Sequence, residues 1–285
     1  MRYLSLLILL FAANIAGAEE PWQQPNDASP AFAPGGAFVV FSRGDGAERH
    51  LYLADREGKD WTAARIAPFS HGWMDLEPAM APDGSYLVFA SNRPAQAGGE
   101  AIDGFFAGKP RPKRGGNLWR VAHDAQGWGE PQRLPATIND GNAIFSPAVA
   151  ADGSLYFMKP DAATGKFRLY VSRQKNGMYD APMALSFSDG TAGDFDPAVA
   201  PDQSFMVFSS ARAPSTSKGS ALFITYATAD GWTAPQPLGP LGIEARLSPD
   251  LATLYYNGPD QRIHQLSLAQ WRQQHPRTDM HGASP

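Results

Sequence analysis

Short apolar runs recur along the chain, and they lack the polar alternation of a half-buried strand. They are rich in β-branched and aromatic residues, which favours strands over helices. A strand without polar alternation is buried on both faces, as in the middle of a sheet that lies between two others. The runs are Phe38–Phe41, Tyr86–Phe89, Leu155–Phe157, Phe205–Phe208 and Leu254–Tyr256.

One short sequence motif, which we call the phrase, precedes each of these runs. Its fullest form is Pro-Ala-x-Ala-Pro-Asp-Gly at 78–84, and its copies occupy residues 29–36, 77–84, 146–153, 196–203 and 244–251. Aligned on the position of Pro30, successive copies are 48, 69, 50 and 48 residues apart. This is the period of a four-stranded propeller blade, with one insertion at 94–116.

Two more strands are predicted after each run. The third strand alternates in polarity, as a partly exposed strand does. The fourth begins with an aromatic residue and has a proline three residues later. This suits an edge strand, where the N–H that proline lacks has no neighbouring strand to bond. The third strands are expected at Leu51–Leu53, Leu118–Val121, Leu169–Val171, Leu222–Ile224 and Ile263–Leu266, and the fourth begin at Trp61, Trp128, Tyr179 and Trp232.

The pattern therefore predicts an all-β fold: a single β-propeller of five blades, each of four antiparallel strands, with six blades as the alternative. The fifth blade has no fourth strand after Leu266. Its aromatic and proline spacing recurs at Trp22 and Pro25, before the first phrase. We expect the N-terminal segment to form that strand and close the ring, which leaves no free sheet edge.

The turns inside the phrases carry a further expectation. Asp83-Gly84 and Asp152-Gly153 are tight-hairpin signals because glycine adopts positive φ at little cost. Gln203 and Leu251 stand where the other copies have glycine. We expect a different turn type in those two copies.

Both ends of the chain are predicted to lie outside the propeller. Residues 1–18 combine a positive start, an apolar centre and an Ala-Gly-Ala site, which is typical of a signal peptide. Residues 19–271 are the expected propeller and 272–285 a flexible tail. We expect a periplasmic or secreted monomer with no integral membrane segment after the signal is removed.

Composition excludes several classes of function. The chain has no cysteine, so thiol catalysis and cysteine zinc sites are excluded. A net charge of −4 does not attract the negatively charged backbone of nucleic acid, so we expect no nucleic-acid partner. The six histidines occupy unrelated repeat positions. The sequence contains no His-Glu-x-x-His zinc motif, no Gly-x-Ser-x-Gly motif, no phosphate loop and no sialidase-type Ser-x-Asp-x-Gly-x-Thr-Trp box. We therefore assign no catalytic residue, no metal site and no cofactor.

The phrase, followed by an aromatic strand and by Ser91-Asn92-Arg93, resembles the TolB-like family of periplasmic propeller repeats, also described as WD40-like. The resemblance extends to about Leu268. It implies a fold and a compartment, whereas function has to be argued from a site. We expect this chain to be without the N-terminal domain that TolB carries, because no room for one precedes Pro30.

Acidic residues before the phrases form the first candidate site. We call the residue equivalent to Pro30 in each copy the blade position. The acidic residues lie one and three residues before it, and these two positions share a face in a regular strand. We therefore expect the acidic side chains to converge at the channel mouth beside Arg246. There they could cap turns, bind calcium, or accept hydrogen bonds from a sugar or a cationic peptide. These residues are Asp27, Asp75, Glu77, Asp194, Asp196 and Glu244.

The insertion at 94–116 is the second candidate site. Its aromatic and basic residues suit a polysaccharide, an acidic protein or an anionic surface, and the alternative is a solvated excursion without a role. The candidates are Phe105, Phe106, Arg111, Lys113 and Arg114.

Two functions follow from these candidates. The favoured one is a non-enzymatic binding or protein-interaction module of the cell envelope, with an envelope protein, a glycan or a peptide as ligand. The alternative is a hydrolase or lyase that acts on glycans or lactones through a pair of the carboxylates. Carboxylates held by backbone amides would favour the first, and an open pair the second.

Overall fold

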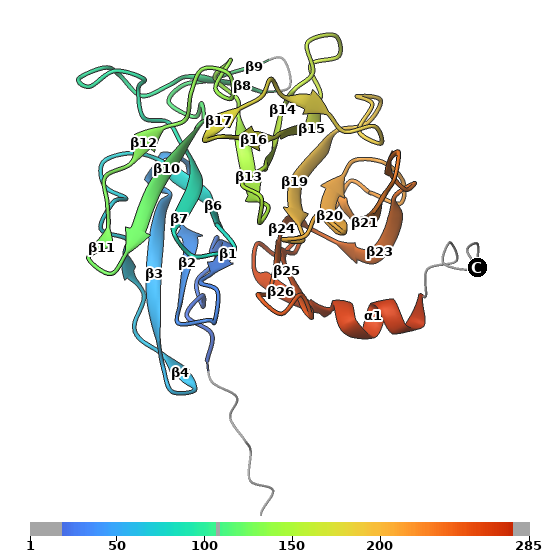
Figure 1. Ribbon diagram of the computed structural model, residues 1–285, viewed down its shortest axis with the longest axis horizontal. Helices are drawn as coiled ribbons and strands as arrows, with labels where there is room; N and C mark the ends of the chain where they lie inside the picture. Colours follow the sequence, from blue (N-terminus) through green and yellow to red (C-terminus); the bar gives the residue numbers. More distant parts are fainter. Residues whose placement is uncertain (1–18, 107–108, 276–285) are drawn as a thin grey trace, which may run out of the picture.

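Five small antiparallel sheets stand in a ring around a common axis in the computed structural model (Figure 1). Residues of the innermost strands line hollows along this axis, which we call the channel. The structure describes residues 19–106 and 109–275. The predicted all-β propeller with five blades is confirmed. The first blade, in blue, and the fifth, in red, lie side by side and complete the ring (Figure 1).

The three inner strands of every blade lie where the repeat predicts them. The innermost strands are β1 (Ala28–Phe32), β6 (Asp75–Met80), β13 (Phe145–Val149), β19 (Asp194–Val199) and β24 (Ile243–Leu247). The second strands are β2 (Phe38–Arg43), β7 (Tyr86–Ser91), β14 (Leu155–Pro160), β20 (Phe205–Ser210) and β25 (Thr253–Asn257). The third strands are β3 (His50–Glu57), β10 (Asn117–Asp124), β15 (Phe167–Ser172), β21 (Ala221–Thr228) and β26 (Ile263–Ser267).

The outermost strand is broken into two short pieces in four blades. The predicted proline, or Ala64 in blade one, lies between the pieces. Proline has no N–H to donate, so its place in this gap removes no hydrogen bond between strands. The pieces are β4 (Asp60–Trp61) and β5 (Arg65–Ile66), β11 (Gly127–Trp128) and β12 (Gln132–Arg133), β17 (Met178–Tyr179) and β18 (Met183–Ala184), and β22 (Gly231–Trp232) and β23 (Gln236–Leu241). The remaining short elements are β8 (Gly104–Phe106), β9 (Lys109–Arg111), β16 (Gln174–Lys175) and the 3₁₀ turn η1 (Gly46–Glu48).

The hydrophobic core is divided among the blade interfaces. One buried cluster lies between each pair of neighbouring blades; Val88 and Phe157, for example, join blades two and three. All six residues of β7 are buried, and so are all six of β20. The second strands are thus enclosed by sheets on both sides, as their lack of polar alternation predicts.

The N-terminal segment meets the fifth blade, but residues 19–27 form no strand. The fifth blade keeps three strands, β24, β25 and β26. Trp22 is buried against Tyr255 of that blade, and the Asn26 N–H donates to the Gln261 carbonyl at 3.1 Å. Pro21 and Pro25 have no N–H to donate, so this segment cannot sustain a regular ladder.

The C-terminal end of the described chain is a short helix, α1 (Leu268–Gln274). Trp271 is buried against blade four, and the Arg272 guanidinium lies over the Phe205 ring at 3.8 Å. Residues 272–274 thus belong to α1 and not to a flexible tail. The predicted signal peptide, 1–18, and the remainder of the predicted tail, 276–285, lie outside the described residues. Within the described chain, no helix combines the length and apolar character needed to cross a bilayer.

The turns at Gln203 and Leu251 do not differ from the glycine turns, so that expectation is wrong. Their φ values are 61° and 60°, beside 75° at Gly84 and 80° at Gly153. Gln203 is held in this left-handed conformation by its side chain, which accepts from the Tyr156 hydroxyl at 2.7 Å and donates to Asp152 at 3.0 Å. At Gln203, tertiary contacts therefore stabilise the conformation that glycine would adopt freely.

Candidate functional site

The residue just before the blade position has the same unusual backbone in all five copies. Its φ lies between 48° and 55°, in the left-handed region that non-glycine residues seldom adopt. A break in register between the first and second strands occurs at this point in each blade, as a β-bulge produces. The bulge turns the side chain toward the other blades. These residues, which we call the polar ring, are Ser29, Glu77, Ser146, Asp196 and Glu244.

Hydrogen bonds join the polar ring from blade to blade. The Ser29 hydroxyl donates to the Glu244 carboxylate, and the Glu244 N–H donates to Asp196 Oδ2 at 2.8 Å. Ser146 donates from its hydroxyl to Asp196 Oδ1 and from its N–H to Glu77 Oε2, both at 2.7 Å. The Glu77 N–H donates to the Ser42 hydroxyl of blade one at 3.0 Å. The three carboxylates are therefore held by backbone N–H and serine groups inside the channel.

Two arginines balance the charge of the polar ring. Arg49 Nη1 lies 3.2 Å from Glu244 Oε1. Arg246 is 6% exposed, and it donates from Nε to the Pro78 carbonyl at 3.2 Å and from Nη1 to the Ala245 carbonyl at 2.7 Å. Arg246 thus spans the channel from blade five to blade two.

The ring carboxyls have divergent acidities. Burial, together with the charges of Glu244 and Asp196, raises the pKa of Glu77 to about 8. Burial and the Glu244 charge likewise raise the pKa of Asp196. Burial acts to raise the pKa of Glu244 as well, but Arg49, the Ser29 hydroxyl and Arg246 outweigh it and lower that pKa. At neutral pH the negative charge is therefore concentrated on the Glu244 side of the channel.

Replacing Glu77 with glutamine is expected to flatten the pH dependence of stability. The pKa of Glu77 rises on folding from 4.5 to about 8, so its stabilising contribution is fully present below about pH 4.5 and is lost as pH rises through about 8. The thermal midpoint of the wild type should fall across this window, and Glu77→Gln should fall less and be the more stable protein at the upper end. Exposed Glu57 provides the control, Glu57→Gln. A variant whose midpoint falls as steeply as that of the wild type would contradict the assignment.

The other three predicted carboxylates do not join the polar ring. Asp27, Asp75 and Asp194 each pair with an arginine of their own blade, at 2.7, 2.9 and 2.7 Å. The prediction that positions one and three before proline share a face is wrong because the bulge between them inserts an extra residue and reverses the alternation. The partners, which sequence reasoning missed, are Arg43, Arg93 and Arg212.

One mouth of the channel is a cleft above the polar ring, which we call the mouth cleft. It comprises two adjoining hollows of about 360 and 510 Å³, which share Leu76, Arg114, Phe145, Ile243 and Glu244. The wall of the smaller hollow is mainly apolar, and Ile243, which lines both hollows, is 42% exposed; the larger hollow also has polar lining residues such as Asn26 and Asn257. Exposed apolar side chains beside buried carboxylates are a common composition for a ligand site.

The insertion reaches the rim of the mouth cleft as a hairpin of β8 and β9. Arg111 and Arg114 line the cleft, and Arg114 extends to blade one, where a Cβ at Gly46 would lie 2.5 Å from its Nη2. Lys113 is exposed and is not among the lining residues; its N–H donates to Asp103 at 2.7 Å. The side chains of Phe105 and Phe106 lie outside the described residues.

The described residues contain no group of three or more His, Cys, Asp or Glu that could hold a metal ion. In the polar ring, the oxygens of Asp196 already accept three hydrogen bonds. Calcium binding at the channel therefore stays a prediction.

Comparison with known proteins supports the fold. No family model and no curated protein matches the chain. TolB from Acinetobacter baumannii matches with a TM-score of 0.51 at 15% identity, over 85% of this chain and 54% of TolB. This chain thus spans about half the length of that TolB.

Two enzymes also match. A thermostable family-43 glycoside hydrolase has a TM-score of 0.55 at 11% identity, over 86% of this chain and 90% of the enzyme. A gluconolactonase from Xanthomonas campestris has a TM-score of 0.51 at 11% identity, over 87% and 77%. Similarities at this level of identity concern architecture alone. In its fold, the chain is a TolB-like β-propeller.

Proposed function

We propose that the protein is a non-enzymatic binding module of the cell envelope, periplasmic or secreted, that takes up a peptide segment of a partner protein in the mouth cleft. The main support is the juxtaposition of an apolar wall with rim arginines. Arg111 and Arg114 have no ion-pair partner among the described residues. Unpaired guanidinium groups are suited to carboxylates because they donate two parallel hydrogen bonds.

The chemistry of the cleft favours a peptide with an acidic and an apolar side chain. The acidic group would meet Arg111 and Arg114, and the apolar one would pack on Phe145, Phe195 and Ile243. Phe167 lies between the two phenylalanines, with ring centroids 6.3 and 5.9 Å away, so the wall is continuous. Aromatic walls of this kind are frequent where peptides bind tightly.

The state of the carboxylates favours binding over catalysis. Glu77 and Asp196 accept hydrogen bonds from backbone N–H groups of neighbouring blades, which is the arrangement expected of a scaffold. One observation supports a hydrolase of glycans or lactones as the second candidate: the pKa of Glu77 is raised and that of Glu244 lowered, as in a pair that divides acid and base roles.

Selection of a displayed random-peptide library on the wild-type protein tests the proposal. Enriched peptides should carry acidic and apolar residues, and Arg114→Ala should weaken their binding by about tenfold or more. Lys59→Ala, an exposed change on the outer edge of blade one, is the control. No enrichment, or equal binding by Arg114→Ala and the wild type, would contradict the proposal. Turnover of aryl glycosides or lactones that disappears in Glu77→Gln would instead support the second candidate.

A further inference from the structure

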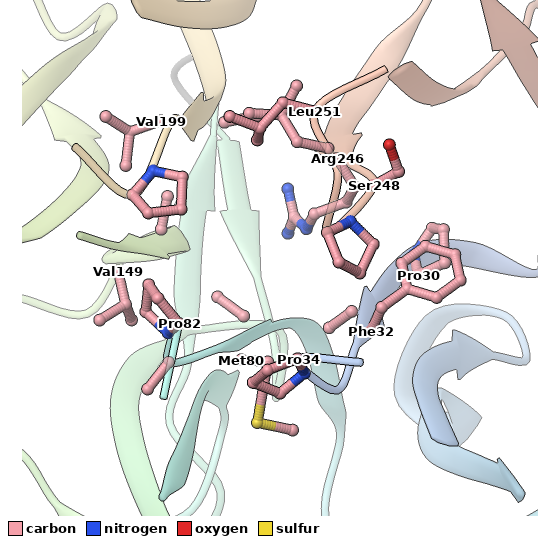
Figure 2. Close-up of a pocket in the computed structure, with 18 of the residues that line it drawn as sticks. Pro30, Phe32, Pro34, Met80, Pro82, Val149, Val199, Arg246, Ser248 and Leu251 are labelled. Carbon is pink, nitrogen blue, oxygen red and sulfur yellow. The ribbon is translucent and has the colours of Figure 1, made fainter. Parts of the chain in front are cut away.

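A second cavity lies at the opposite end of the channel from the mouth cleft. It has a volume of about 280 Å³ and is lined by the C-terminal halves of the five innermost strands and the turns that follow them (Figure 2). We call it the lower cavity. Figure 2 shows proline rings and the side chains of Phe32, Met80 and Val199 around its rim.

The wall of the lower cavity is apolar except at two residues of the fifth blade, Arg246 and Ser248. The Ser248 hydroxyl is already engaged, since it donates to Asp250 at 2.5 Å and accepts from the Thr253 N–H at 2.9 Å. Arg246 is therefore the polar group left to recognise a ligand. Its guanidinium projects into the cavity between the strands (Figure 2).

Arg246 replaces a small residue of the repeat. The equivalent position in the other four blades is alanine: Ala31, Ala79, Ala148 and Ala198. Four of the five blades thus form without a cation at this position. A charged side chain that the repeat does not require is a candidate for ligand recognition.

The hydrogen bonds of Arg246 are incomplete. A guanidinium has five N–H donors, and Arg246 uses Nε and Nη1 on two backbone carbonyls. Its Nη2 is buried and has no acceptor among the described residues. A buried donor without an acceptor is unfavourable, so an oxygen that entered from the cavity would be stabilised there.

The carboxylates near Arg246 are engaged by other groups. Glu77, Asp196 and Glu244 face it from the polar ring. Glu244 is paired with Arg49, and the raised pKa of Glu77 keeps that group largely protonated at neutral pH. Asp196 is the remaining carboxylate near Arg246. Its oxygens accept from the Ser146 and Ser209 hydroxyls and from the Glu244 N–H, and no ion pair joins it to Arg246 within the described residues.

We propose that the lower cavity binds a small organic carboxylate, whose acid group is held by Arg246 and whose aliphatic body packs against the proline, valine and methionine side chains of the wall. The volume suits a compact ligand, since pockets for drug-sized molecules begin at about 300 Å³. This site is separate from the mouth cleft and does not depend on the proposed function.

Titration calorimetry with hexanoate tests the proposal, and 1-hexanol and hexylammonium serve as neutral and cationic probes of the same length. Hexanoate should bind the wild type at least tenfold more tightly than hexanol does, and hexylammonium should not bind. In the wild type, hexanoate should also shift the NMR signal of the Arg246 Nε–H, a measurement that needs no variant.

Two variants localise the ligand. Arg246→Ala introduces the residue of the other four blades and should weaken hexanoate at least tenfold. Ala148→Leu keeps Arg246 but fills the cavity, and should abolish binding; Lys59→Ala is the control. Absence of hexanoate binding to the wild type, equal affinity for hexanol, or unchanged affinity in both cavity variants would overturn the proposal. So would a loss in Arg114→Ala as large as in Arg246→Ala, because the ligand would then lie in the mouth cleft.

Discussion

Replacing Trp22 with alanine should lower the thermal midpoint of the propeller by on the order of 10 °C, because it costs about 3–5 kcal/mol of unfolding free energy. Trp22 is only 8% exposed. It contacts Phe32, Phe41 and Tyr255 edge to face, with ring centroids 5.8, 6.1 and 5.6 Å away. Since Tyr255 belongs to the last blade and the other two to the first, this one side chain joins both ends of the ring.

Thermal unfolding followed by circular dichroism measures this effect. Deletion of residues 19–26 should lower the midpoint further, because it also removes the Asn26 hydrogen bond to Gln261. Met178→Ala is the matched control, since Met178 is apolar but 71% exposed. A deletion variant with the midpoint of the wild type would show that the ring does not depend on its N-terminal segment.

Replacing Arg93 with methionine should destabilise the protein by about 3–5 kcal/mol, because it leaves the Asp75 carboxylate buried without a counter-charge. Asp75 has no exposed side-chain area and accepts from Arg93 at 2.9 Å and from the Ser70 hydroxyl at 2.7 Å. Burial already raises the pKa of Asp75, although the Arg93 charge opposes it. Methionine keeps much of the length of the side chain, so the change removes mainly the charge.

Urea unfolding of a double-mutant cycle separates the charge from the packing. Asp75→Leu combined with Arg93→Met should recover most of the loss, since a buried ion pair is often replaceable by apolar residues of similar volume. Arg65→Met is the control, because the Arg65–Asp55 pair is exposed and should contribute less than about 1 kcal/mol. A double variant no more stable than Arg93→Met would show that the pair is not the cause.

The repeat predicts the strands well because each blade buries its second strand in the same way. The five copies differ in sequence but share their spacing, so even the divergent fifth copy could be aligned with the others. The closing segment was located by the same logic through Trp22, yet its backbone could not be predicted. Whether a terminal segment forms a ladder depends on which N–H groups face the last strand. The spacing of Trp22 and Pro25 does not show this, and Pro21 is a second residue without an N–H.

The candidate site was predicted only in part, and the bulges explain why. Glu77, Asp196 and Glu244 were identified, but Ser29 and Ser146 were missed although they hold the same position in the phrase. A search for charged residues does not select serine, whereas a comparison of equivalent repeat positions would have identified Ser29 and Ser146. The arginine partners of Asp27, Asp75 and Asp194 depend on register: Asp75 lies opposite Ser91, two residues before Arg93.

The left-handed residues of the polar ring have a consequence for how this scaffold can change. The bulge is a property of the backbone, so each blade presents one side chain to the axis whatever its identity. Serine, aspartate and glutamate already occupy the position in different blades, and the next position but one accepts either alanine or arginine. A single substitution at one of these positions can therefore change the charge and polarity of the channel lining while the blades around it keep their structure.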